Sequence, residues 1–350
     1  MLSDRSGITA AGTWIVDYAK LISQFPDEGA CASVFTETTH NGGAPYNLLV
    51  NLCRLGSPFP LRGLGCLGQD LDGDSIMKDC KAHAIDTARI RTVPGAATSF
   101  SDVMIARETG VRTSFNHAGA NDLLRFEDFD FDENPSRILF LGSLFFLAGL
   151  DAKESKFGTF AASVLAHARR RGMLTCVDIE RTNVPLSLFQ ESARASLKQT
   201  DLVILNVEVA EMLSMIRIRF PSGVDLFAAE RAATELRALA QARCVVIRFP
   251  SGAFALAVSG ERIAQGSVSL PKSRIVSAAG AGHAFTSGFL YGYHENWPLE
   301  DCLKAANATA AACLTDQTAS GGIRKLSDCL KRLEKYGQRR LESMRIDQRE

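Results

Sequence analysis

Two short segments combine glycines with polar side chains in a way that suits the binding of a small ligand. The first reads Asn41-Gly42-Gly43-Ala44-Pro45-Tyr46-Asn47 and leads into a helical pattern over 45–54. Paired glycines let backbone N–H groups approach a ligand hydroxyl closely, and the Asn47 amide, one turn into the helix, can donate and accept hydrogen bonds. The pattern favours a binding site for a hydroxyl group, although the same glycines are also typical of a structural turn.

The second segment reads Gly280-Ala281-Gly282-His283 and opens a predicted helix over 283–293. The first N–H groups of a helix have no internal partner, and the helix dipole adds positive potential at that end. This chemistry favours a phosphate site at Gly280, Ala281 and Gly282. Small residues there are also a close-packing solution for a helix against a sheet, so both interpretations stay open.

The elements that must position these segments alternate in type from about residue 137 onward. Short apolar runs predict strands at 138–144, 173–179, 201–205, 244–247 and 253–258. Helical patterns lie between and after them, at 153–171, 209–216, 226–241, 299–315 and 326–344. Strands separated by helical crossovers predict an α/β fold with a mostly parallel, doubly wound sheet.

The first 120 residues follow a different pattern. Alternating segments at 30–39, 98–107 and 111–117 predict β-ribbons, and Glu108-Thr109-Gly110 is a plausible hairpin turn between the last two. Helices are predicted over 45–54 and 73–83. A small sheet assembled from segments this far apart in sequence is a candidate lid over the main domain.

In this order and separation, the two glycine segments resemble the two signatures of the ribokinase-like PfkB carbohydrate kinases. The resemblance extends from about residue 13 to 323, and the first signature also matches at Gly65, Gly68, Asp70 and Gly73. It implies a ribokinase-like three-layer α/β sandwich with a mostly parallel central sheet and a small β-sheet lid. We expect one domain over 1–350, with lid segments at about 11–41 and 95–120 and a C-terminal helix and charged tail over 325–350.

The resemblance also implies roles for individual residues. The substrate-binding set is Asp17, Gly42, Gly43, Asn47 and Asn121. The nucleotide-binding set is Asn206, Arg248, Gly252 and Asn307, next to the anion hole at Gly280, Ala281 and Gly282. The implied ligands are a carbohydrate or nucleoside together with ATP and Mg²⁺, and the implied assembly is a homodimer through the lid.

The phosphoryl-transfer side departs from the family pattern. The family motif Asp-Thr-x-Gly-Ala-Gly-Asp, whose last Asp is the general base, is replaced by Ser277-Ala278-Ala279-Gly280-Ala281-Gly282-His283, and the Glu of Asn-x-x-Glu is replaced by Val209. The helix dipole is expected to lower the pKa of His283 and weaken it as a base. Arg248 either contacts a phosphate in place of a metal or blocks the nucleotide.

Two functions therefore remain open on sequence. The first is a protein that binds a sugar or nucleoside and transfers phosphate weakly or not at all. The second is an active ATP-dependent carbohydrate kinase, in which His283 or a nearby carboxylate has become the base.

The amino-acid composition limits the kinds of partner that we expect for this protein. The 39 basic and 39 acidic residues give no net charge, which excludes the basic footprint of a nucleic-acid or anionic-membrane partner. The nine cysteines contain no C-x-x-C pair and lie mostly in apolar runs, so reduced thiols and a cytoplasmic location are expected. The sequence contains neither a long apolar run nor a His/Cys/Asp/Glu cluster with metal-ligand spacing, so no membrane anchor and no metal site of the protein's own are predicted.

Overall fold

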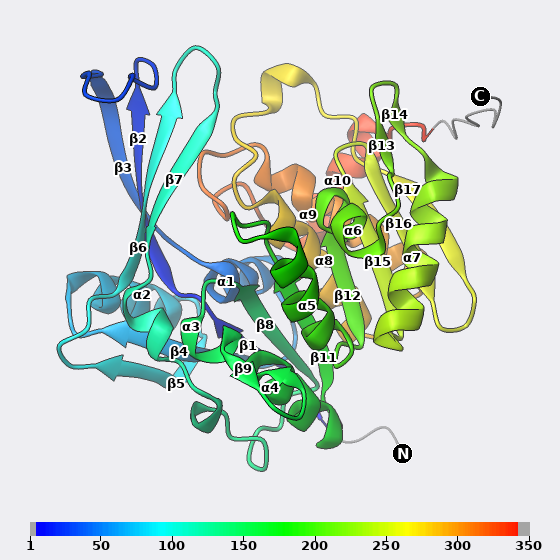
Figure 1. Cartoon of the computed structure of the whole chain (residues 1–350). Helices are drawn as coiled ribbons and strands as arrows, with labels where there is room; N and C mark the ends of the chain where they lie inside the picture. The colour runs from blue at the N-terminus through cyan, green and yellow to red at the C-terminus, as the bar shows by residue number, and fades with distance from the viewer. Residues whose placement is uncertain (1–4, 342–350) are drawn as a thin grey trace.

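A nine-stranded sheet lies at the centre of the computed structural model, which describes residues 5–341 (Figure 1). Its strand order is β17-β16-β15-β12-β11-β8-β1-β4-β5. The bounds in chain order are β1 (Ile8–Gly12), β4 (Leu61–Gly68), β5 (Asp86–Val93), β8 (Ile138–Leu144), β11 (Leu174–Ile179), β12 (Leu202–Asn206), β15 (Cys244–Phe249), β16 (Gly252–Ala257) and β17 (Arg262–Gly266). All pairings from β15 to β5 are parallel, which confirms the predicted sheet.

The strand predicted at 253–258 joins this sheet in the antiparallel direction. β16 pairs with β15 through the short turn at Pro250 and Ser251, and β17 continues the antiparallel edge. A turn this short can only reverse the chain, because a parallel connection needs a crossover of a dozen or more residues.

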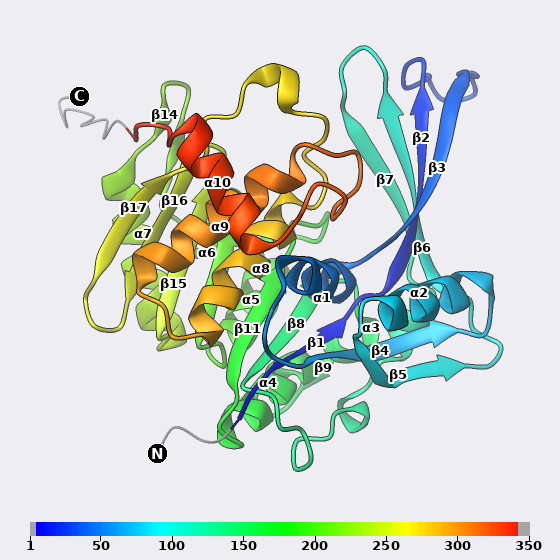
Figure 2. The ribbon, with the colours of Figure 1, turned by 180° about the vertical axis from the view of Figure 1, so that it is seen from behind.

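Helices cover both faces of the central sheet, which gives the three expected layers. Figure 1 shows one layer, formed by α4 (Phe160–Arg170), α5 (Leu186–Leu197), α6 (Val207–Ser214) and α7 (Leu226–Ala240). Figure 2 shows the opposite layer, formed by α1 (Ala44–Leu55), α2 (Leu71–Ala82), α8 (Ala281–His294), α9 (Leu299–Cys313) and α10 (Leu326–Tyr336). Each layer buries its apolar side chains against the sheet, so the core has two main halves.

A separate four-stranded sheet stands away from the central sheet (Figure 1). It has the order β3-β2-β6-β7, with β2 (Ile15–Ile22), β3 (Val34–Gly42), β6 (Ser99–Ala106) and β7 (Arg112–His117). We call it the small sheet. The β2–β6 pair is parallel and the two outer pairs are antiparallel. The predicted hairpin turn joins β6 to β7, and β3 begins four residues later than predicted.

A buried tryptophan ties the start of β2 to the central sheet. Trp14 is fully buried, and its indole Nε1 donates to the carbonyl oxygen of Leu64 at 2.9 Å. A Cβ atom at Gly63 or Gly65 would lie 2.8 or 2.3 Å from the indole ring, so β4 needs glycine at both positions. The Asn121 amide accepts a hydrogen bond from the Trp14 N–H at 3.0 Å and donates one to the Trp14 carbonyl at 3.2 Å.

Two predicted helices have different bounds in the structure. The helix predicted over 153–171 begins at Phe160, because Thr159 caps it through the N–H of Ala162 and Gly158 precedes the cap with a φ of 94°. The helix predicted over 326–344 ends at Tyr336, where Gly337 has a φ of 70° and residues 337–341 are not helical. The remainder of that prediction, 342–344, lies outside the described residues.

The cysteines are all free, and seven of the nine are buried. In the described part of the chain, no helix combines the length and the apolar character needed to cross a bilayer.

Candidate functional site

The glycine pair of the first segment lets the chain pass close to Asp17. Gly42 ends β3 beside β2, and a Cβ atom there would lie 2.7 Å from Asp17 Oδ2. Gly43 is the N-cap of α1 with a φ of 96°, and its Cβ would lie 2.0 Å from the carbonyl oxygen of Thr13. A side chain at either position would displace β2 or the carboxylate that it carries.

Asp17 belongs to a polar row across the small sheet. The strand register places His40, Asp17, Ser101 and Asn116 side by side on the four strands. Burial raises the pKa of Asp17, whereas the charges of Arg112, His40 and His283 act in the opposite direction. This row therefore offers hydroxyl, amide and carboxylate groups on the side of the small sheet that approaches α8.

Asn47 joins the first segment to the second. Its side chain is buried in α1, and Nδ2 lies 3.4 Å from Nδ1 of His283. Its Oδ1 is buried and has no hydrogen-bond partner among the described residues. Because buried amide oxygens are normally satisfied, this atom is suited to accept a hydrogen bond from a ligand hydroxyl.

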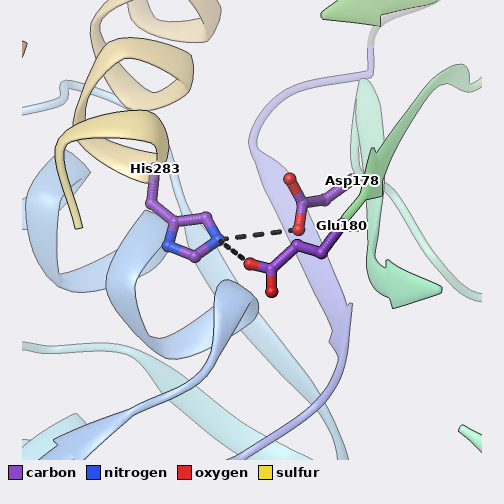
Figure 3. A group of neighbouring side chains, drawn as sticks. All are labelled: Asp178, Glu180 and His283. Carbon is purple, nitrogen blue, oxygen red and sulfur yellow. Dashed lines mark ion pairs between the residues drawn. The ribbon is translucent and has the colours of Figure 1, made fainter. Parts of the chain in front are cut away.

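His283 lies in the first turn of α8 and faces two carboxylates (Figure 3). Its Nε2 is 3.6 Å from Oδ2 of Asp178 and 3.8 Å from Oε1 of Glu180. Asp178 lies in β11 and Glu180 directly follows it, at the carboxyl end of a central parallel strand where α/β proteins place their ligands. The Ser143 hydroxyl donates to Asp178 Oδ2 at 2.7 Å and fixes that carboxylate.

These carboxylates correct the expected behaviour of His283. Burial acts to lower the pKa of His283, but Asp178 and Glu180 outweigh burial and raise the pKa above its ordinary value. The reciprocal effect lowers the pKa of Asp178: burial opposes it, and the contact with His283 is the largest effect in its favour. The helix dipole is thus not the deciding influence, and the two carboxylates favour the protonated form of the imidazole.

Arg248 meets the same turn of α8 from the end of β15. A Cβ atom at Gly282 would lie 2.5–2.8 Å from three atoms of the Arg248 guanidinium, so that group rests directly against the predicted anion hole. Burial lowers the pKa of Arg248, and Asp178 and Glu180 counteract this. Gly280 caps α8 with a φ of 75°, in tight contact with Ala319.

Four other predicted site residues have structural contacts in this fold. The Asn121 amide hydrogen-bonds to the backbone of Trp14 through both its oxygen and its nitrogen, so this residue positions β2 and Asp17. Asn206 caps α6 by accepting a hydrogen bond from the N–H of Val209 at 2.8 Å. Gly252 packs against the Gln265 carbonyl, and the buried Asn307 amide lies 3.4 Å from the Gln265 side chain.

The residues present do not fit a hydrated magnesium ion at the position that the family pattern implies. Val209 is fully buried and apolar, and the amide oxygen of Asn206 is used as a helix cap. The neighbouring Glu208 is ion-paired with Arg181 at 2.6 Å. The carboxylate that the family pattern has at position 209 is therefore missing, and the neighbouring Glu208 is already paired.

Two cavities stand out in the described part of the structure. The larger, of about 500 Å³, is next to Glu180 and is lined by Arg181, Thr182, Asn183, Val184, Leu186, Glu208, Glu211, Met212 and Arg219. The smaller, of about 300 Å³, is lined by Leu270, Ser273, Arg274, Val276, Thr315, Arg332 and Tyr336. Within the described part of the chain, no residue predicted for the site lines either cavity.

A family model for the pfkB family carbohydrate kinases matches residues 10–326. The chain belongs to the pfkB family. A 5-dehydro-2-deoxygluconokinase of Geobacillus kaustophilus is 24% identical over 314 residues, which cover 86% of this chain and 87% of that protein. An uncharacterized sugar kinase of Archaeoglobus fulgidus is 24% identical over 276 residues, covering 76% and 95%.

Solved structures confirm the ribokinase-like fold of this pfkB-family chain. The ribokinase of Arabidopsis thaliana complexed with ribose and ATP superimposes with a TM-score of 0.75 at 20% identity, covering 94% of this chain and 99% of that one. The ribokinase of Cryptococcus neoformans in complex with ADP gives a TM-score of 0.75 at 16% identity, covering 95% and 100%.

Asp178 and Glu180 are the site residues that sequence analysis missed. They follow the strand pattern of 173–179, and carboxylates at the end of a predicted parallel strand are the signal that could have found them. With His283 they form a group whose ligand atoms lie within 4.8 Å of one another, a donor set that metal ions also use. A search for closely spaced metal ligands in the sequence cannot find this group. Its three residues come from elements about 100 residues apart.

Proposed function

We propose that this pfkB-family protein binds a carbohydrate or nucleoside between the small sheet and the carboxyl edge of the central sheet, and transfers phosphate weakly or not at all. The observation that carries this proposal is the pairing of His283 Nε2 with Asp178 and Glu180. A protonated imidazole cannot accept the proton of a substrate hydroxyl. Loss of a general base typically lowers the rate by about 10²–10⁴-fold.

The sugar side of the site supports the binding half of the proposal. Asp17 lies in the polar row of the small sheet, and Asn47, whose Oδ1 is unpaired among the described residues, lies beside His283. Carboxylate and amide oxygens accept hydrogen bonds from hydroxyl groups, so these atoms suit a polyol. The relatives named as sugar kinases agree with that class of ligand.

An active kinase is the second candidate, and Glu180 favours it. Its side chain is about half exposed, at 47%, and lies beside His283. Desolvation and the charge of Asp178 raise the pKa of Glu180, which brings this carboxylate closer to the range useful for a general base. In that case Glu180 would take the role that the family gives to the residue at position 283.

One experiment separates the two candidates. ATP consumption is measured with a panel of hexoses, pentoses, keto-deoxy sugar acids and nucleosides, alongside thermal-shift binding on the same panel with and without Mg²⁺. The proposal expects sugar-induced stabilisation without turnover. Turnover above background that Glu180→Gln abolishes, and that the exposed control Glu235→Gln retains, would establish the second candidate instead.

The small sheet is proposed to have two further roles, as the lid of the site and as the surface of a homodimer. Large apolar side chains on or beside it are exposed, namely Phe25, Val34, Phe35, Val111 and Phe115. Contiguous apolar side chains of this size are typical of protein interfaces. The free, mostly buried cysteines favour a reducing compartment such as the cytoplasm.

A further inference from the structure

Part of the predicted nucleotide site is closed by the chain itself. Gly252 and Asn307, both in the predicted nucleotide-binding set, pack against Gln265 in β17. A Cβ atom at Gly252 would overlap the Gln265 carbonyl oxygen, and the Asn307 amide donates to Gln265 Oε1 at 3.4 Å. Asn307 is 3% exposed and Gln265 is 5% exposed. In this arrangement the two residues do not fit a nucleotide, which can reach them only if the end of β17 moves.

The segment that follows α10 holds the end of β17 in that position. We call this segment, residues 337–341, the strap. The Gly337 carbonyl accepts a hydrogen bond from the N–H of Ser269 at 3.0 Å, and the N–H of Arg339 donates to the Ser267 carbonyl at 2.8 Å. An antiparallel bridge lies between these two hydrogen bonds. The strap is thus paired like a short strand with the residues that directly follow β17.

Gly266, the last residue of β17, is in close contact with the strap. A Cβ atom there would overlap the Arg339 carbonyl oxygen, and the three atoms nearest to it all belong to Arg339. Gly266 is not among the glycines with a positive φ, so its backbone conformation does not itself require glycine. The closeness of the strap is therefore the reason that a side chain does not fit here. Because Gly266 directly follows Gln265, the strap contacts the chain beside the residue that closes the site.

The strap itself is held by little buried surface. Residues 337–340 are exposed, and Leu341 is only partly buried. A segment that buries few side chains and is held by a pair of backbone hydrogen bonds opens at a low free energy. Its release would remove the contact at Gly266, and the end of β17 would then be free to withdraw from Gly252 and Asn307.

We propose that the strap is an autoinhibitory segment, which closes the nucleotide half of the site while it pairs with residues 267–269 and opens it when it is released. This inference goes beyond the proposed function and does not depend on it, because that proposal concerns sugar binding and the group at position 283. The nucleotide and the paired strap exclude each other. The apparent affinity for a nucleotide is then the affinity of the open form reduced by the fraction of molecules that are open.

Two variants of the full-length chain release the strap by different means. Gly266→Ala places a methyl group against the Arg339 carbonyl oxygen, and Arg339→Pro removes the N–H that the Ser267 carbonyl accepts. Arg339→Ala keeps both backbone groups of the strap and is the matched control. Thermal melting shows whether each variant is folded. Because position 339 is exposed, Arg339→Pro keeps the test available if Gly266→Ala does not fold.

Two measurements on these variants test the inference. Amide hydrogen exchange at Ser269, whose N–H donates to Gly337, reports release of the strap and should be faster in Gly266→Ala and Arg339→Pro. Isothermal titration calorimetry with ADP, and with ATP in the presence and absence of Mg²⁺, measures nucleotide affinity. That affinity should rise about tenfold in both variants, since a pair of backbone hydrogen bonds of ordinary net strength corresponds to roughly that factor. It should stay at the wild-type value in Arg339→Ala.

The outcomes for the strap and for the proposed function differ. Faster exchange at Ser269 with unchanged nucleotide affinity would overturn the autoinhibitory role. Unchanged exchange in both variants, or no nucleotide binding by any of the proteins, would refute it as well. ATP turnover by a released variant would support the strap and overturn the proposed function. Sugar binding without any nucleotide binding would have the opposite meaning for the two proposals.

Discussion

At the scale of single residues, the site depends on where the charge near position 283 lies. In the family pattern a carboxylate at this position accepts a proton, whereas here the imidazole of His283 faces two carboxylates at the end of β11. An acidic group at position 283 is therefore replaced by a basic one. An Asp at position 283 would therefore restore the family's carboxylate, but it would also lie against the carboxylates of Asp178 and Glu180.

His283→Asp alone should raise ATP-dependent phosphoryl transfer less than about tenfold, well below the range for a fully restored base. Three carboxylates would then lie together with only Arg248 to neutralise them, and Val209 would still provide no metal ligand. Initial rates of ATP consumption measure this. A gain of several hundredfold would show that the base was the sole missing group.

The raised pKa of His283 predicts a pH-dependent stability. A His with a folded pKa above its unfolded value of about 6.5 stabilises the protein fully below that pH, and the contribution is lost as the pH rises through the folded pKa. The free energy of unfolding of the wild type should therefore exceed that of His283→Gln by about 1–3 kcal/mol near pH 6. This difference should shrink at alkaline pH.

Urea unfolding of both proteins between pH 6 and pH 9 measures this difference. The same comparison in a Glu180→Gln background removes the titration of that carboxyl. A difference that stays constant or grows with rising pH would contradict the proposed imidazolium.

At the scale of elements, one carboxylate connects α2 to the small sheet. Asp70 accepts hydrogen bonds from the N–H of Gly73 at 2.9 Å and from the N–H and hydroxyl of Thr98, each at 2.6 Å. Burial opposes ionisation, but these hydrogen bonds lower the pKa of Asp70. Thr98 directly precedes β6, so the cap of a helix also anchors the small sheet.

Asp70→Ala should lower the free energy of unfolding by about 0.5–2 kcal/mol, the usual cost of an N-cap, and should speed amide exchange at Ser99 and Ser101. Denaturant unfolding and hydrogen exchange measure the two effects. Asp74→Ala, in the same first turn but exposed and outside this network, is the matched control. Equal losses in both variants would mean that Asp70 acts only through the helix dipole.

Helices and strands with a clear apolar pattern could be predicted from sequence. Those with a weak apolar pattern could not. β8 was predicted with its observed bounds and α7 to within one residue, because apolar residues dominate β8 and recur at helical spacing along α7. α5 was missed because its buried face is small, formed by Phe189, Ala193, Ser196 and Leu197. In the site, the glycines and Asn47 were predicted from local motifs, whereas Asp178 and Glu180 reach His283 only through the order of strands in the sheet.

At the scale of the whole molecule, the small sheet presents more apolar surface than its own packing uses. Phe25 and Phe115 stack with ring centroids 6.4 Å apart, yet they remain 50% and 53% exposed. A second copy of the chain would cover such side chains and hold the small sheet, with its polar row around Asp17, in place beside the carboxyl edge of the central sheet. Formation of the proposed dimer would in this way also fix the position of the proposed lid.

Phe115→Glu should convert the proposed homodimer to monomer, because a charge cannot be buried in an apolar contact without a partner. Size-exclusion chromatography with light scattering measures the mass of each species. Phe227→Glu on α7, where the phenylalanine is 52% exposed but far along the chain from the small sheet, is the matched control. A monomeric wild type would refute the dimer.

The enclosure of Trp14 gives the protein an optical reporter of its own. The chain contains two tryptophans, and the other, Trp297, is partly exposed. Trp14 is fully buried, fixed by Leu64 and Asn121, and separated by only two residues from Asp17. A Trp297→Phe variant would therefore have one emitting indole at the root of β2, and its fluorescence would follow occupancy of the site without any attached label.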